Sequence, residues 1–113
     1  MNICAAIIGM GIGQKHLEAI DKYKGSKVKI ICEKNKNKVK ILKKIYPQKI
    51  FVNNYEDIFQ HKDINLVSIA SYDDDHFNQI LMCIKYNKNF IVEKPMCLNL
   101  NELKLIQKKL LKK

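Results

Sequence analysis

Three glycines stand two residues apart in the stretch IIGMGIGQKH, at Gly9, Gly11 and Gly13. Glycine lets a backbone approach an anion closely, and the N–H groups at the start of a helix can then bind phosphate oxygens. The dinucleotide-binding fingerprint is G-x-G-x-x-G, and here the third glycine comes one residue earlier. Three interpretations follow: a shortened dinucleotide loop that includes Ile12, the G-x-G-x-G of a methyl-donor pocket, or an ordinary tight turn.

A carboxylate follows the second apolar run of the chain. Glu33 ends the stretch KIICE, about 20 residues after Gly13, and Lys34 is its neighbour. An acid at the end of a second strand can accept hydrogen bonds from ribose hydroxyls, and a solvated acid is the simpler alternative. We assign Glu33 and Lys34 to the candidate cofactor site.

A polar loop follows the fourth apolar run, in the stretch SYDDDH. Ser71 and Tyr72 begin the loop and are candidate cofactor contacts. His76 lies where the next helix begins, and it either contacts the nicotinamide end of a bound dinucleotide or faces water. The three acids at positions 73–75 are typical of a helix start, where the helix dipole favours negative charge, and we do not interpret them as a metal site.

Lys94 follows the fifth apolar run and lies between Glu93 and Pro95. A lysine ammonium at the mouth of a parallel strand can donate to an oxygen of a substrate or cofactor. Lys94 is therefore the candidate catalytic residue, and Glu93 and Lys94 are both assigned to the cofactor site.

Apolar periodicity predicts the elements that must position these residues. Strands are expected over residues 3–8, 28–32, 50–52, 66–70 and 90–92. Helices are expected over residues 14–24, ending at Gly25; around 39–46, ending before Pro47; 54–59, capped by Asn54; and 74–86, ending at Asn87. A last helix begins at Asn99, where Glu102 completes a capping box, and is expected to turn Leu103, Ile106 and Leu110 inward.

This alternation of strands and helices is typical of a parallel sheet with helices on both faces. We predict one domain, residues 1–113, with a Rossmann-like, doubly wound α/β fold of about five strands. In such folds ligands bind beyond the carboxyl ends of the strands, at the switch point between the first and the fourth. The polar stretches described above all follow strands, so we expect them to converge on one crevice.

Composition argues against nucleic acid, a membrane or a metal as partners. The formal charge is +10, but all 21 basic residues are lysine and they are scattered, which indicates a solvated surface; phosphate and base recognition favours arginine. No apolar stretch is long enough to span a membrane, and no basic region precedes the first one, so we expect a cytoplasmic protein. Four separated cysteines predict neither disulfides nor a zinc site: Cys4, Cys32, Cys83 and Cys97.

In their order along the chain, these segments resemble the glucose–fructose oxidoreductase, inositol dehydrogenase and rhizopine-catabolism (Gfo/Idh/MocA) family. The resemblance covers almost the whole chain, through AAIIGMGIGQKH, KIICEK, NNYEDIF, LVSIASYDDDHFNQI and above all NFIVEKPMCLNLNEL. It implies an oxidoreductase that binds NAD(H), or NADP(H), and moves a hydride to or from a hydroxyl of a sugar, sugar nucleotide or cyclitol. It also implies that Lys94 sits beside the nicotinamide and the substrate hydroxyl, with His76 on the neighbouring loop.

Some members carry a shortened G-x-G-x-G-x-x-H loop, which the three glycines and His16 would match. The methyl-donor interpretation of the glycines gives no role to the E-K-P segment at residues 93–95. Because a carboxylate repels a 2′-phosphate, Glu33 predicts a preference for NAD over NADP. Tyr72 departs from the family, which commonly has proline there.

Members of the family are several times longer than 113 residues. They have a sixth strand and a second α/β domain that supplies the substrate pocket. We therefore expect either the N-terminal part of a longer enzyme, whose sugar-type substrate binds through the missing domain, or a short form that binds a nucleotide without catalysis. Without a sixth strand, residues 89–92 would form an open sheet edge, which favours a homo-oligomer.

Overall fold

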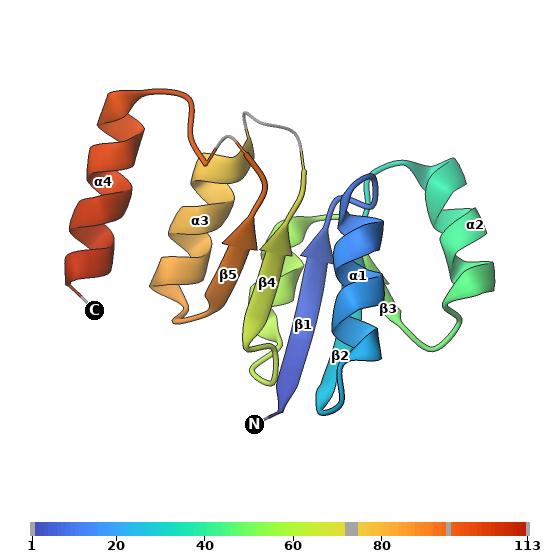
Figure 1. Ribbon diagram of the computed structural model, residues 1–113. Coiled ribbons are helices and arrows are strands. Elements are labelled where there is room, and N and C mark those ends of the chain that lie inside the picture. Colours follow the sequence, from blue (N-terminus) through green and yellow to red (C-terminus); the bar gives the residue numbers. More distant parts are fainter. Residues whose placement is uncertain (1, 72–74, 95, 113) are drawn as a thin grey trace.

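A five-stranded parallel sheet forms the centre of the protein, as a computed structural model that describes residues 2–71, 75–94 and 96–112 shows (Figure 1). The strands are β1 (Ile3–Ile8), β2 (Ser26–Cys32), β3 (Ile50–Val52), β4 (Leu66–Ile69) and β5 (Asn89–Val92). Their order is β3-β2-β1-β4-β5, with every neighbouring pair parallel. The predicted Rossmann-like α/β fold is confirmed, and the switch point lies between β1 and β4.

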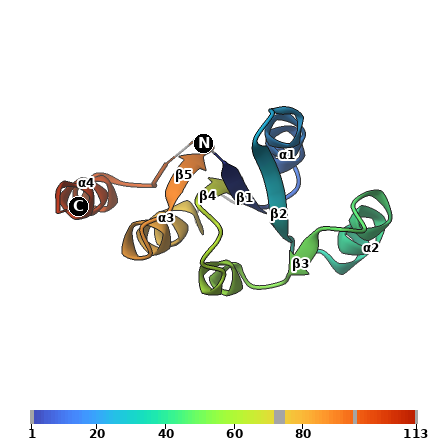
Figure 2. The same cartoon turned by 90° about the horizontal axis from the view of Figure 1, so that it is seen from below.

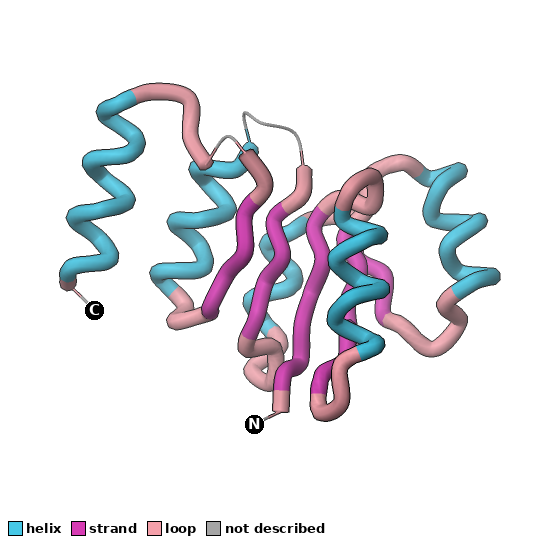
Figure 3. Tube along the Cα trace, in the orientation of Figure 1, coloured by secondary structure: helices cyan, strands magenta, loops and turns pink. Residues whose placement is uncertain are grey.

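Helices cover both faces of this sheet. The helices of the described chain are α1 (Gly13–Lys22), α2 (Lys36–Ile45), the 3-10 helix η1 (Tyr55–Gln60), α3 (His76–Lys85) and α4 (Leu100–Leu111). Figure 2 shows α1 and α2 on one face and η1 and α3 on the other, with α4 beside α3 at the end of the sheet nearest β5. Because the strands are all parallel, the loops that follow them lie at the same edge of the sheet, the upper edge in Figure 3.

The core consists of two apolar layers, one on each side of β1. Ala5 and Ile7 pack with Leu17 of α1 and Leu42 of α2. On the other face a second layer joins the sheet to η1, α3 and α4, and it includes Ala6, Ile8, Ile58, Ile80 and Ile106. Successive side chains of a strand point to opposite faces, so a strand buried on both faces has the continuous apolar run seen in ICAAII.

Most predicted elements are present, with shifts at their ends. The second strand begins at Ser26, two residues before the predicted start, because Ile3 of β1 pairs with Ser26. α1 ends at Lys22, and Gly25 uses its positive φ of 85° in the turn to β2 instead of at the helix end. Three asparagine side chains accept a backbone N–H at helix starts, namely Asn35, Asn54 and Asn99.

The prediction for the last helix was wrong at two of its three apolar positions. Ile106 is buried, but 43% of Leu103 and 46% of Leu110 is exposed. α4 packs against α3 and does not lie over the sheet. Only a narrow apolar stripe of α4 is therefore buried in the contact between the two helices. The turn from Cys97 into α4 is held as expected: Asn99 accepts from the Glu102 N–H, and the Glu102 carboxylate accepts from the Leu98 N–H.

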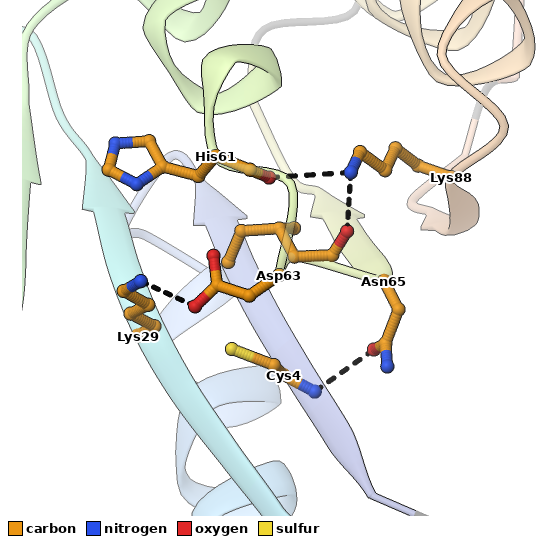
Figure 4. Close-up of polar contacts among 7 residues, drawn as sticks. Cys4, Lys29, His61, Asp63, Asn65 and Lys88 are labelled. Carbon is orange, nitrogen blue, oxygen red and sulfur yellow. Dashed lines mark hydrogen bonds and ion pairs between the residues drawn. The ribbon is translucent and has the colours of Figure 1, made fainter.

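The amino edge of the sheet is closed by polar contacts around the turn that joins η1 to β4 (Figure 4). Lys88 donates to two carbonyl oxygens of this turn, at 2.6 and 3.4 Å, and Asn65 accepts from the Cys4 N–H at 2.9 Å. Lys29 forms an ion pair with Asp63 and lowers the pKa of that carboxyl. Because these polar groups bond one another, we assign them a role in stabilising the fold.

One long edge of the sheet is open in the described chain. β5 pairs with β4 on one side, and no described strand pairs with its other side. Ile91, in the middle of β5, is 46% exposed. The open edge expected along residues 89–92 is therefore present in the structure.

We expect Gly9→Ala to lower the free energy of unfolding by ~1–3 kcal/mol. Gly9 has a φ of +88°, and an added Cβ would lie 2.7 Å from the Ala70 carbonyl oxygen. Gly11→Ala is the matched control, because a Cβ there meets no atom within 4 Å and Gly11 has no positive φ. Urea unfolding of both variants measures the difference, and equal stability would contradict this account of Gly9.

The open edge generates a second prediction, that the 113-residue chain self-associates. Lys85, Lys88 and the lysines near the C-terminus should oppose association by repulsion, so the associated mass should rise with salt. Light scattering at low and high salt measures this mass. A monomer at both salt concentrations, with the amides of residues 89–92 protected from hydrogen exchange, would show that the edge is already covered.

Candidate cofactor site

A cavity of about 370 Å³ opens at the carboxyl edge of the sheet, at the switch point between β1 and β4. Residues after three different strands line it: Gly9, Met10 and Gly11; Glu33, Lys34 and Asn35; Ala70 and Ser71. Asp75 and Gln79, at the start of α3, complete one side, and Tyr55 of η1 contributes to another. The expected convergence of polar loops is thus observed for the loops after β1, β2 and β4.

The three glycines have different structural roles. Gly9 allows the end of β1 to touch Ala70 beyond β4, and its N–H donates to the Cys32 carbonyl oxygen at 2.9 Å. A Cβ on Gly13 would lie 2.7 Å from Cγ2 of Ile7, so this glycine lets α1 pack closely on β1. No atom lies within 4 Å of a Cβ built on Gly11, which lines the cavity. The packing of the protein therefore does not require a glycine at position 11.

The start of α1 presents a positive helix end without a neutralising side chain. Ile12 is its N-cap residue, makes no side-chain cap, and is 56% exposed. No acidic residue occurs in the first turn of α1. Uncapped N–H groups and the helix dipole favour an anion at such a position. The open space over Gly11 is thus combined with groups that can bind a phosphate.

Glu33 is fixed by two backbone N–H groups and is not the solvated acid of the simpler interpretation. Its Oε1 accepts from Met10 N–H and its Oε2 from Asn35 N–H, each at 3.0 Å. The side chain is 13% exposed, and the Lys38 ammonium lies 3.9 Å from Oε1. A carboxylate offers about four acceptor positions, so two remain for ligand hydroxyls. Lys34 lines the same part of the cavity.

Two side chains of α3 hold Ser71, which follows β4. Ser71 Oγ donates to Gln79 Oε1 at 2.6 Å, and His76 Nε2 donates to the Ser71 carbonyl oxygen at 2.9 Å. His76 is 1% exposed, so the alternative that it faces water is wrong, and it does not line the cavity. The structure shows that His76 bonds Ser71, and its predicted contact with a nicotinamide stays a prediction. Tyr72, a predicted cofactor contact, lies outside the described residues.

Lys94 and Glu93 follow β5 at the same sheet edge but do not line this cavity. Lys94 is exposed. Glu93 points toward α1, where its Oε1 lies 2.6 Å from His16 Nε2, and His16 Nδ1 lies 2.5 Å from Ser68 Oγ. Ser68 was missed from the sequence because it lies within an apolar strand, and its polarity among Val67 and Ile69 was the available signal.

The thiol in the cavity is not activated, and the described residues form no metal centre. Burial, with the neighbouring charge of Glu33, raises the pKa of the Cys32 thiol to about 12, so this cavity-lining sulfur stays protonated. Among the residues that the structure describes, no three His, Cys, Asp or Glu side chains gather closely enough to hold a metal ion. In the same residues, no helix has the length and apolar character needed to cross a bilayer.

Comparison with known proteins agrees with this architecture. An uncharacterized oxidoreductase of Synechocystis is 28% identical over 102 residues, which is 89% of this chain and 28% of that protein. The crystal structure of scyllo-inositol dehydrogenase from Lactobacillus casei is 25% identical, with a TM-score of 0.89 over 98% of this chain and 34% of that one. Myo-inositol 2-dehydrogenase from Lactobacillus plantarum is 24% identical, with a TM-score of 0.88 over 99% of this chain and 34% of that one.

The chain spans about a third of the length of these relatives. Residues 3–113 match the sequence model of the Gfo/Idh/MocA family, which is described as an oxidoreductase family with an NAD-binding Rossmann fold. This match covers nearly all of the chain and agrees with the strand order and the glycine loop described above. The chain therefore belongs to the Gfo/Idh/MocA family of oxidoreductases, through their NAD-binding Rossmann domain.

Proposed function

We propose that this chain is the cofactor-binding part of an NAD-dependent oxidoreductase that acts on a hydroxyl group of a sugar, sugar nucleotide or cyclitol. The observation that carries the proposal is the open backbone at Gly11, at the uncapped start of α1 and beside the fixed carboxylate of Glu33. The cyclitol part is supported by the two structural relatives, which are named as inositol dehydrogenases, and the sugar part rests on the resemblance to the family.

The pyrophosphate of the cofactor fits the space above Gly11. A side chain at this position would fill the space without touching the protein, so a glycine there leaves room for a ligand. The N–H groups at residues 11–13 would donate to phosphate oxygens, with the dipole of α1 adding to the attraction. Gly13 and Ile12 contribute through their backbone, which agrees with the exposure of the Ile12 side chain.

The adenosine ribose would lie against Glu33. This carboxylate is already oriented by the N–H groups of Met10 and Asn35, so little conformational freedom is lost when it accepts from ribose hydroxyls. Lys34 and Ser71 line the cavity on either side and would contact the remaining parts of the cofactor.

Lys94 would act at the opposite end, next to the nicotinamide. When bound, the cofactor supplies the hydride acceptor. The Lys94 ammonium would orient the substrate hydroxyl by donating a hydrogen bond to its oxygen, and it would stabilise the negative charge that develops on this oxygen as the hydroxyl proton passes to water. Lys94 is exposed at the sheet edge, where a substrate could reach it.

Isothermal titration of the chain with NADH tests the proposal, with Gly11→Val as the decisive variant. Valine fills the space above the loop, so we expect binding to be lost while the fold and its unfolding midpoint are retained. Gln48→Val, which adds the same side chain at an exposed position away from the cavity, is the control and should bind as the parent does.

Two outcomes would contradict the proposed function. A folded Gly11→Val variant that binds NADH like the parent would show that the loop does not bind the pyrophosphate. A parent chain that binds S-adenosylmethionine but not NADH would instead support the methyl-donor interpretation of the three glycines.

Glu33 generates a prediction about cofactor choice. Repulsion between its carboxylate and a 2′-phosphate should make NADH bind about tenfold or more tightly than NADPH. Glu33→Gln keeps one acceptor oxygen and removes the charge, so the ratio of the two affinities should fall toward one. Calorimetry with both cofactors measures this ratio. Tighter binding of NADPH than NADH by the parent would contradict the role of Glu33.

A further inference from the structure

His16 joins α1 to β4 and to the end of β5. The residue lies in the first turns of α1, and its ring nitrogens contact Ser68 Oγ of β4 at 2.5 Å and Glu93 Oε1 after β5 at 2.6 Å. Ser68 is fully buried, while the side chains of His16 and Glu93 are 19% and 35% exposed. The three side chains form a line that runs from the interior of the sheet to its carboxyl edge.

The chemistry of the partners sets the direction of these hydrogen bonds. An ionised carboxylate can only accept, so Nε2 of His16 carries the hydrogen and donates to Glu93. In the neutral ring Nδ1 is then an acceptor, and the Ser68 hydroxyl donates to it; in the protonated ring Nδ1 donates to Ser68 Oγ. The bond between His16 and Glu93 is retained in both states.

The hydrogen bond between His16 and Glu93 connects α1 to the end of β5. α1 packs against β1, β2 and β4. Within residues 2–71, 75–94 and 96–112, His16–Glu93 is the only side-chain hydrogen bond that connects α1 to residues 89–94. β5 is an edge strand, and Ile91, which faces the same side of the sheet as Ser68, is 46% exposed. The end of β5 therefore has little other packing on this face to fix its direction.

We propose that His16 is a positioning residue for Lys94. By holding Glu93 against α1, His16 fixes the backbone turn that carries the next residue, Lys94. The position of this turn is fixed relative to the start of α1, which follows the glycine loop at residues 9–13. The distance between the pyrophosphate position and the Lys94 ammonium is thereby set within the protein before a cofactor binds. This inference rests on the proposed function, in which Lys94 acts at the nicotinamide end.

A structural role alone would have a different consequence. If the three side chains only stabilised the fold, their loss would lower the free energy of unfolding and affect all ligands of the cavity equally. In a positioning role, the Lys94 ammonium held next to the nicotinamide would also donate to an oxygen of that half of the cofactor, so its displacement would weaken the nicotinamide half and leave the adenosine half unchanged. Comparison of NADH with ADP-ribose, which lacks the nicotinamide, separates the two roles.

The experiment measures the affinities of NADH and ADP-ribose for two substitutions at position 16. Gln extends its amide to the position of Nε2 and can donate to Glu93, whereas Asn reaches only the position of Nδ1, next to Ser68. We expect the parent and His16→Gln to bind NADH about tenfold more tightly than ADP-ribose, and His16→Asn to lose this difference. Glu93→Ala should match His16→Asn, and the double variant should show no further loss.

Asn65→Ala is the matched control for a purely structural effect. Asn65 also joins two elements by side-chain hydrogen bonds, to Cys4 N–H and to the Asn2 carbonyl oxygen, but at the opposite edge of the sheet. It should lower the unfolding midpoint without changing the ratio of the two affinities. The same unchanged ratio in His16→Asn would overturn the positioning role.

The results for the parent chain separate this inference from the proposed function. A parent that binds neither NADH nor ADP-ribose contradicts the proposed function and removes the basis of the inference. A parent that binds both with equal affinity leaves the cofactor site supported and overturns only the role of His16 and Lys94 at the nicotinamide end.

Discussion

The close approach of Gly9 to Ala70 is the contact on which the carboxyl edge of the sheet depends. β1 lies between β2 and β4, and the turn at its end is bonded to both: the Gly9 N–H donates to Cys32, and the Ala70 N–H donates to Ile8. A side chain at position 9 would separate these strand ends, since its Cβ would lie 2.7 Å from the Ala70 carbonyl oxygen. The direction in which α1 leaves the sheet, and with it the cavity, follows from this turn.

Two carboxylates hold the segment that leads from this turn into α1. Glu33 binds the backbone N–H of Met10 at one end, and Glu93 binds the ring of His16 at the other. In a chain with a formal charge of +10, both of these acids bond groups at the candidate site, and among the described lysines only Lys38 forms an ion pair with one of them, 3.9 Å from Glu33. The segment from Gly9 to the first turns of α1 is thus fixed between the Glu33 carboxylate and a group next to Lys94.

The sequence was most informative where local order determines structure. The apolar periodicity predicts where the strands end. Because residues that follow parallel strands lie at one edge of the sheet, it also predicts the location of the glycine turn and of Glu33. The contacts of His16 could not be predicted, since its partners are 52 and 77 residues away and depend on the strand order. Leu103 and Leu110 were misplaced because periodicity identifies the apolar side of α4 but not the width of the surface that covers it.

The geometry of the three glycines agrees with the three roles that glycines have in a dinucleotide-binding turn. Those roles are a tight turn, a backbone open to the pyrophosphate, and close packing of the helix on the strand. Gly9 has the positive φ of the turn, Gly11 has the open side, and Gly13 packs against Ile7 even though it comes one residue early. α1 begins directly at Gly13, so this glycine lies in the first turn of the helix. The connection from β1 to α1 is therefore one residue shorter than in G-x-G-x-x-G and still has a glycine at the tight turn, at the open position and at the helix packing contact.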